Sequence, residues 1–193
     1  MKFYKMHGLG NDFIIIDCFR EKVSRGYGEL AIKLCDRHFG IGADGLVLVL
    51  PSDNDDVCMR MFNPDGSESE MCGNAIRCIA RFVYDHKIVD KRIIRVETLA
   101  GTMVPEIVTG DNGVLVRADM GEPRLERTLI PMEGPWSRVI NEPISVDDKE
   151  LKVTCVSMGN PHCVTFVNDV EKVDLREIGP KVENHSLFPR RTN

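Results

Sequence analysis

The sequence lacks the features that mark several large classes of protein. It has no uninterrupted apolar run of about 18 residues, so we expect no membrane-spanning helix. Asn11 and Asp12 lie where a secretion signal needs an unbroken apolar stretch, so we expect the protein to stay in the cytoplasm. Blocks of Lys and Arg are absent and the formal net charge is −5, which argues against a nucleic-acid partner. The expected partner is a small molecule.

The seven cysteines are poorly spaced for a disulfide framework or a structural zinc site. Their number is odd, their spacing is irregular and no two form a C-x-x-C pair. Cys35 and His38 form a lone C-x-x-H, which supplies too few ligands to hold a metal ion. We therefore expect reduced thiols and no metal.

The composition is that of an ordinary globular protein, with 193 residues, 42% hydrophobic and 28% charged. Such a chain can bury one good core or two modest ones. Short apolar or alternating runs, bounded by Gly, Asp or Asn, predict several strands. They lie at residues 13–16, 46–50, 58–62, 93–96, 102–108, 114–116, 151–156 and 163–167.

Helical spacing of apolar residues predicts two helices, and capping signals predict a third. The first runs through Ala31, Leu34, Cys35 and His38, and the second has one face made of Ala75, Ile79 and Phe82. The third is expected from an N-cap at Asp174 to Gly179, where Pro180 should end it. The pattern is α+β, with mainly antiparallel strands and a few helices.

The segment 120–150 differs from its surroundings, because it holds four of the ten prolines and few periodic runs. We interpret it as a domain boundary or a long connection. The predicted domains are residues 1–118 and 119–193.

The glycines at 40–45 match the dinucleotide-binding pattern G-x-G-x-x-G. That pattern binds a pyrophosphate only when it follows a strand and opens a helix. Here the predicted order is reversed, with a helix before and a strand after. We therefore predict a tight turn, not a nucleotide site.

Cys72 is the strongest candidate for a reactive residue. A polar turn at 63–70 leads into the second predicted helix, which should begin at Cys72 or just after it. A thiol in the first turn of a helix faces the positive end of the helix dipole, which favours the thiolate. The free N–H groups from Gly73 and Asn74 onward could bind a carboxylate. From the residues alone, a small buried cysteine is an equally good interpretation.

Four motifs resemble the diaminopimelate epimerase family and together extend over essentially the whole chain. They are Lys5-Met6-His7-Gly8-Leu9-Gly10-Asn11-Asp12-Phe13, then Phe62-Asn63-Pro64-Asp65-Gly66-Ser67-Glu68 with Met71-Cys72-Gly73-Asn74-Ala75-Ile76-Arg77-Cys78, Val156-Ser157-Met158-Gly159-Asn160-Pro161-His162-Cys163-Val164, and Phe188-Pro189-Arg190-Arg191-Thr192-Asn193.

The resemblance implies a fold of two pseudo-symmetric domains, each with mainly antiparallel strands around a central helix. It implies that Cys72 is the first of two catalytic cysteines and that His162 tunes the thiols. The matching substrate-contacting positions are Asn11, Asn63, Gly73, Asn74, Asn160 and Asn193. By themselves Asn11 and Asn160 could be turn residues and His162 a core residue. One position departs from the pattern, because some members carry a substrate-contacting Gln where this chain has Gly45.

The implied reaction is the cofactor-independent epimerisation of LL-diaminopimelate to the meso form, in the biosynthesis of lysine and peptidoglycan precursors. Two thiols, one on each face of Cα, exchange roles as base and acid. The C-G-x-G segment that carries the second cysteine has no match here. We therefore expect an incomplete second domain and an inactive fragment of an enzyme that is commonly a homodimer.

Two other interpretations remain open. The chain could be another two-cysteine racemase, or an isomerase like those of phenazine biosynthesis, although the latter uses a carboxylate base. It could instead be a catalytically silent binding or assembly module.

Overall fold

The structure, a computed structural model, describes residues 1–23, 26–110, 113–135 and 137–193. The chain divides into two compact units, Met1–Asp119 and Met120–Asn193. Most of the regular structure is strand, with three α-helices among the described residues. The predicted α+β class is thus confirmed.

Unit 1 is a mixed sheet with the strand order β1-β2-β3-β4-β6-β7, to which β5 adds beside β4. Strands β8 and β9 form a separate hairpin. Most neighbours are antiparallel, but β2 runs parallel to β3 and β4 parallel to β6. The elements are β1 (Tyr4–Gly8), β2 (Asn11–Asp17), α1 (Tyr27–Cys35), β3 (Gly45–Leu50), β4 (Val57–Phe62), β5 (Glu68–Ser69), α2 (Gly73–Asp85), β6 (Val96–Thr98), β7 (Gly101–Met103), β8 (Glu106–Gly110) and β9 (Gly113–Arg117).

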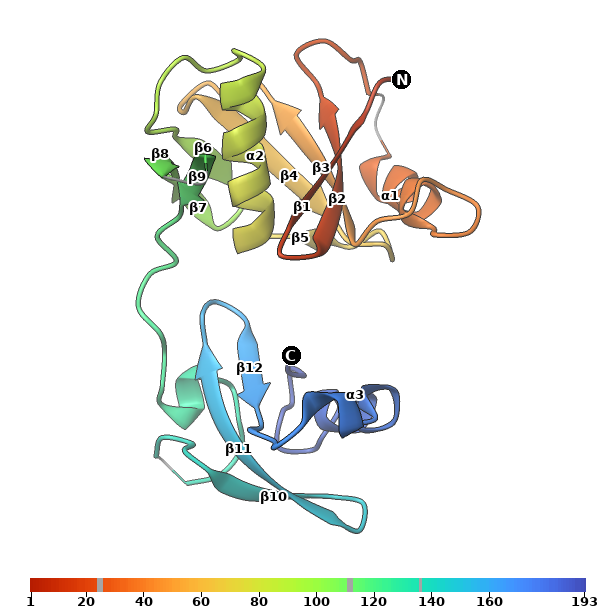
Figure 1. Ribbon diagram of the computed structural model, residues 1–193, viewed down its shortest axis with the longest axis vertical. Helices are drawn as coiled ribbons and strands as arrows, with labels where there is room; N and C mark the ends of the chain where they lie inside the picture. The colour runs from red at the N-terminus through yellow and green to blue at the C-terminus, as the bar shows by residue number, and fades with distance from the viewer. Residues whose placement is uncertain (24–25, 111–112, 136) are drawn as a thin grey trace. The chain divides into compact units, whose positions relative to one another are not determined.

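Strand β2, between β1 and β3, is buried on both faces, which explains why its sequence is a continuous apolar run instead of an alternating one. Phe13 and Ile15 point into the core that contains α2, whereas Ile14 and Ile16 point into the core that contains α1. Figure 1 shows α2 lying along the sheet. Helix α2 packs on β1, β4 and the β8–β9 hairpin. The sheet thereby fixes the start of α2 next to the β1–β2 turn.

Unit 2 is a three-stranded antiparallel sheet in the order β10-β11-β12, with α3 against β10. Its core combines residues of the strands with others from the irregular segments, such as Ile130 and Phe188. The elements are the 3-10 helix η1 (Arg127–Leu129), β10 (Glu142–Val146), β11 (Lys149–Ser157), β12 (Pro161–Val164), the 3-10 helix η2 (Val170–Lys172) and α3 (Leu175–Glu183).

Several predicted element bounds are wrong. Helix α1 ends at Cys35, and His38 lies in the turn beyond it, because Asp36 accepts hydrogen bonds from the backbone of His38 and Phe39. The predicted strand 102–108 is broken into β7 and β8 at Pro105, which has no N–H for a ladder bond. The predicted strand at 93–96 begins only at Val96, and that at 163–167 is displaced to Pro161–Val164.

The capping signal of α3 is confirmed, since Asp174 accepts hydrogen bonds from the backbone of Arg176 and Glu177. The predicted end at Pro180 is wrong, because the helix continues to Glu183. Its last turn is held by Asn184, whose backbone and side-chain nitrogens both donate to the carbonyl of Pro180.

Candidate functional site

Cys72 is the N-cap of α2, which confirms the predicted start of that helix. Its backbone is extended, with φ −142° and ψ 122°, and its carbonyl accepts the first helical hydrogen bond from Ile76. The N–H groups of the first turn have no partner inside the helix. The side chain of Cys72 makes no capping hydrogen bond to them. The half-buried thiol of Cys72 thus lies beside unpaired donors that favour an anion.

Two asparagines from the sequence motifs meet at this thiol. The Oδ1 of Asn11 accepts a hydrogen bond from Nδ2 of Asn74 at 3.3 Å. The same oxygen lies 3.9 Å from Sγ of Cys72, within hydrogen-bonding distance of a thiol donor. Asn11 opens β2 opposite Gly8, the last residue of β1. The β1–β2 turn thereby brings Asn11 to the start of α2. Cys72, Asn11 and Asn74 form one polar cluster in unit 1.

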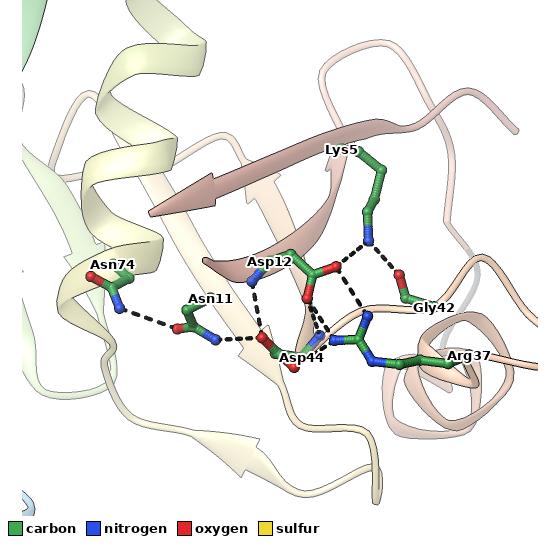
Figure 2. Close-up of polar contacts among 7 residues, drawn as sticks. All are labelled: Lys5, Asn11, Asp12, Arg37, Gly42, Asp44 and Asn74. Atoms are coloured by element: carbon green, nitrogen blue, oxygen red, sulfur yellow. Dashed lines mark hydrogen bonds and ion pairs between the residues drawn. The ribbon is translucent and has the colours of Figure 1, made fainter. Parts of the chain in front are cut away.

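Behind Asn11 lies a network of charged side chains, drawn in Figure 2. Arg37 Nη2 donates to Asp12 Oδ1 and to Asp44 Oδ1, each at 2.7 Å. Lys5 donates to Asp12 at 2.6 Å and also contacts the carbonyl of Gly42. The hydrogen bonds from Arg37, followed by that from Lys5, hold the pKa of Asp12 well below its usual range. Asp12 thus remains charged at neutral pH.

Asp44 connects this charge network to the cluster around Cys72. Its Oδ2 accepts hydrogen bonds from Nδ2 of Asn11 and from the backbone N–H of Asp12, each at 3.0 Å. This role of Asp44 was not predicted from the sequence. Asp44 lies at the end of the glycine segment 40–45. An acidic side chain that directly follows a tight turn could have been singled out from the sequence as a candidate site residue.

The glycine segment itself is a turn, as predicted. It connects α1 to β3, and Gly42 has φ +81°, a value that glycine adopts without strain. Its backbone closes onto the end of α1, since Ile41 and Gly42 both donate to the carbonyl of Leu34. This arrangement places a helix before the glycines and a strand after them, the reverse of a nucleotide-binding turn.

Asn63, Gly73 and Gly45 have different surroundings from those of Asn11. Nδ2 of Asn63 donates to Ser67 Oγ at 3.0 Å within the turn after β4. Gly73 is the first residue of α2, and its carbonyl accepts from Arg77. Gly45 is buried, and a Cβ there would lie 3.1 Å from Cε of Met61. A Gln side chain at 45 would therefore require this part of the core to move.

Unit 2 brings together the other three predicted site residues around β12. Nε2 of His162 lies 3.2 Å from Oδ1 of Asn160. The backbone of Asn193 runs beside the strand, where its N–H donates to Pro161 and its carbonyl accepts from Cys163. Asn160, His162 and Asn193 thus belong to one local surface.

The remaining cysteines of unit 1 differ from Cys72 in their surroundings. Burial raises the pKa of Cys35 and Cys58, and it raises that of Cys78 to about 11. Burial also raises the pKa of Cys18 to about 11, with a further contribution from Asp17. The side chain of Cys58 on β4 is half-buried. These thiols are poor acids at neutral pH.

Within the described part of the chain, no group of three or more His, Cys, Asp or Glu side chains could hold a metal ion. None of the helices in that part is long and apolar enough to cross a membrane.

Comparisons with known proteins agree on one family. Residues 3–126 match the family model described as diaminopimelate epimerase. The chain is 60% identical to the diaminopimelate epimerase of Pelotomaculum thermopropionicum and 52% identical to that of Heliobacterium modesticaldum. In both cases the match covers 100% of this chain and 70% of the relative.

Solved structures with lower sequence similarity share the fold. A hydroxyproline epimerase from Agrobacterium vitis superposes with a TM-score of 0.60 at 14% identity, covering 94% of this chain and 54% of the other. A phenazine biosynthesis protein of the PhzF family from Bacillus anthracis gives a TM-score of 0.58 at 20% identity, covering 84% and 53%. This chain therefore spans about half the length of the solved structures it resembles.

Proposed function

Because this chain belongs to the diaminopimelate epimerase family, we propose that it carries half of the acid–base machinery that interconverts LL- and meso-diaminopimelate. The observation that carries the proposal is the placement of the Cys72 thiol at the start of α2, against Asn11 and Asn74. The reaction belongs to the biosynthesis of lysine and peptidoglycan precursors, and we assign it to the cytoplasm.

Inversion at Cα requires a base on one face of the substrate and an acid on the other. The Cα–H of an amino acid is a very weak acid, so the negative charge that develops when it is removed must be stabilised. The N-terminus of α2 supplies N–H groups from Gly73 and Asn74 for the substrate carboxylate. Cys72 then transfers the proton at one face of Cα, and a second thiol acts at the other.

The proposed substrate-contacting residues are those that match the family's motifs. They are Asn11, Asn63, Gly73, Asn74, Asn160 and Asn193. His162 would tune the thiols, and its contact with Asn160 supports a role in a polar site. Thiol acid–base chemistry of this kind needs no cofactor, and we propose that the working enzyme is a homodimer.

No segment of these 193 residues matches the C-G-x-G motif that would carry the second cysteine. We therefore propose that these residues alone do not turn over the substrate. The alternatives are another two-cysteine racemase with this fold and a silent binding module. An isomerase of the phenazine type is less well supported, because such an enzyme uses a carboxylate base and the candidate reactive residue here is Cys72.

The test joins this chain to the part of the Pelotomaculum thermopropionicum relative that the match does not cover. The joined protein should convert LL-diaminopimelate to the meso form and incorporate solvent deuterium at Cα in D2O. Cys72→Ser should lower kcat by at least about a thousandfold, because a serine hydroxyl is a far weaker acid than a thiol. Cys18→Ser is the matched control, since Cys18 is also half-buried and lies away from α2.

A second measurement uses this chain without any addition. An aziridine analogue of diaminopimelate should alkylate Cys72, identified by peptide mass mapping, and leave Cys18 unmodified. Wild-type turnover in the Cys72→Ser variant would contradict the proposal. Turnover of a different amino acid in preference to diaminopimelate would favour another racemase, and an inert but folded protein would favour the binding module.

A further inference from the structure

The carboxylate of Asp44 determines which way the side-chain amide of Asn11 points. A carboxylate accepts hydrogen bonds and cannot donate them, whereas an amide has a donor nitrogen and an acceptor oxygen. Because Asp44 Oδ2 accepts from Nδ2 of Asn11 at 3.0 Å, the oxygen of that amide must point the other way. Figure 2 shows the amide held in this manner between Asp44 and Asn74.

The oxygen of Asn11 consequently faces the groups at the start of α2. It accepts the Nδ2–H of Asn74 at 3.3 Å and lies 3.9 Å from Sγ of Cys72. An oxygen in this place accepts a hydrogen bond from the S–H form, but its lone pairs repel a thiolate. With the amide reversed, its N–H group would donate to the thiolate instead. The orientation of Asn11 thus affects the balance between thiol and thiolate at Cys72.

Asp44 is itself held in place from the opposite side. Arg37 bridges its Oδ1 and the carboxylate of Asp12, each at 2.7 Å. The backbone N–H of Asp44 donates to the carbonyl of Asp12, and the backbone N–H of Asp12 donates to Asp44 in return. Lys5 completes the charge balance by pairing with Asp12. Both oxygens of Asp44 are thus engaged, which leaves the carboxylate little freedom to rotate away from Asn11.

We infer that Asp44 is a positioning residue, which holds Asn11 with its oxygen toward Cys72 and thereby favours the protonated thiol. The helix N-terminus favours the thiolate, so the two effects oppose each other. A cysteine that must alternate between acid and base is served by such a balance. The catalytic meaning of this inference rests on the function proposed above, but the effect on the thiol can be measured without turnover.

The experiment measures the rate at which iodoacetamide alkylates Cys72 in this chain between pH 5 and pH 10, read by peptide mass mapping. Asp44→Asn leaves an amide that can donate or accept, so Asn11 is no longer restricted to one orientation. The midpoint of the rate profile should move to lower pH by on the order of one unit. Asp85→Asn is the matched control, because Asp44 and Asp85 each pair with an arginine and both side chains are 42% exposed. It should leave the midpoint unchanged.

A direct effect of the lost negative charge on the thiol must be separated from the effect through Asn11. The same substitution is therefore repeated in an Asn11→Ala background. If Asp44 acts through the amide, the shift should shrink severalfold in that background. A shift of equal size in both backgrounds, or no shift in either, would overturn the inference. Charged and titratable groups near the cluster include Lys5, Asp12, Arg37, Asp44, Arg77 and Cys78. Of these, Asp44 alone changes within each comparison.

A measurement on the unsubstituted chain covers the case in which Asp44→Asn fails to fold. Neutron diffraction from a deuterated crystal distinguishes the nitrogen of Asn11 from its oxygen. Deuterium on the end that faces Asp44 is expected, and the opposite orientation would overturn the inference. The proposed function can fail independently. If the joined protein lacks epimerase activity but the alkylation shifts appear, the proposed function is wrong and the positioning role of Asp44 is still supported.

Discussion

Gly8 lies so close to Asn74 that a Cβ added to Gly8 would stand 3.2 Å from the Cβ of Asn74. This contact joins the end of β1 to the first turn of α2. It allows Asn74 to reach Asn11, the residue paired with Gly8 across the β1–β2 turn. A glycine is needed here for close approach, not for an unusual backbone conformation.

The first prediction is that Gly8→Ala separates α2 from the β1–β2 turn by a few tenths of an ångström and weakens the hydrogen bond from Asn74 to Asn11. In the protein joined to the unmatched part of the relative, kcat should fall about tenfold or more, because small displacements of catalytic groups are costly. Gly10→Ala is an informative comparison, since a Cβ there meets nothing within 4 Å but its φ of +90° is strained. Gly10→Ala should lower stability, whereas Gly8→Ala should lower kcat at nearly unchanged melting temperature. Equal kcat in Gly8→Ala and the parent protein would contradict this account.

The sequence predicted those parts of the site that depend on local signals. A polar turn followed by apolar residues at helical spacing predicted the start of α2 at Cys72. Both signals lie within a few residues of each other. The buried strand β2 follows from its apolar run. These features depend on interactions along the chain or on the presence of a core.

The contacts between distant segments were not predictable in the same way. Asp44 reaches Asn11 because β2 and β3 pair in parallel, with Phe13 opposite Gly45. A register of this kind is set by how the two cores pack and leaves no mark in either segment alone. The continuation of α3 past Pro180 was also not predictable from the sequence. Proline ends most helices, and here tertiary packing overrides that preference.

The second prediction concerns the pH dependence of the pairing between Asp12, Arg37 and Lys5. The pKa of Asp12 is lowered in the folded state, so its charged form stabilises the fold above its ordinary value of 3.8. That stabilisation should be lost as the pH falls through and below this value. Asp12→Asn should therefore cost about 2 kcal/mol at pH 7 and much less near pH 2.

The measurement for Asp12 is thermal unfolding followed by circular dichroism at several pH values. The melting temperatures of the parent chain and of Asp12→Asn should converge at low pH. Glu106→Gln provides a control, because the pair of Glu106 with Arg117 is well exposed and worth little. A difference for Asp12→Asn that stays constant with pH would show that the loss comes from packing and not from the charge.

The third prediction distinguishes two cysteines that face each other across β11 and β12. Cys155 and Cys163 are paired in register. The hydrogen bond between the two thiols, together with burial, raises the pKa of Cys155, whereas the same bond lowers the pKa of Cys163. Iodoacetamide at pH 8 should therefore modify Cys163 well before Cys155. In Cys155→Ala, which lacks the donor thiol, the modification of Cys163 should slow severalfold at the same pH. An unchanged rate would refute the dependence of Cys163 on its neighbour.

The fourth prediction concerns the buried charge of unit 2. The side chain of Arg127 is 1% exposed, donates to the carbonyl of Glu133 at 3.0 Å and pairs with Glu142. Glu142→Gln keeps the shape of the acceptor but leaves the arginine charge without its counter-charge. Such a change in the interior costs about 3 to 5 kcal/mol, but Glu142 is 35% exposed, so we expect about 1 to 3 kcal/mol.

Hydrogen exchange followed by mass spectrometry reports on unit 2 separately, since the amides of β10 and β11 lie within it. Protection of those amides should fall in Glu142→Gln, whereas protection of β2 and β3 in unit 1 should not change. Arg127→Met tests the same pair from the other side, because it removes the buried charge as well as the pairing. If the cost arises from an unpaired charge, Arg127→Met combined with Glu142→Gln should be less destabilised than the sum of the two single variants. Additive effects would assign the cost to packing around Arg127 instead.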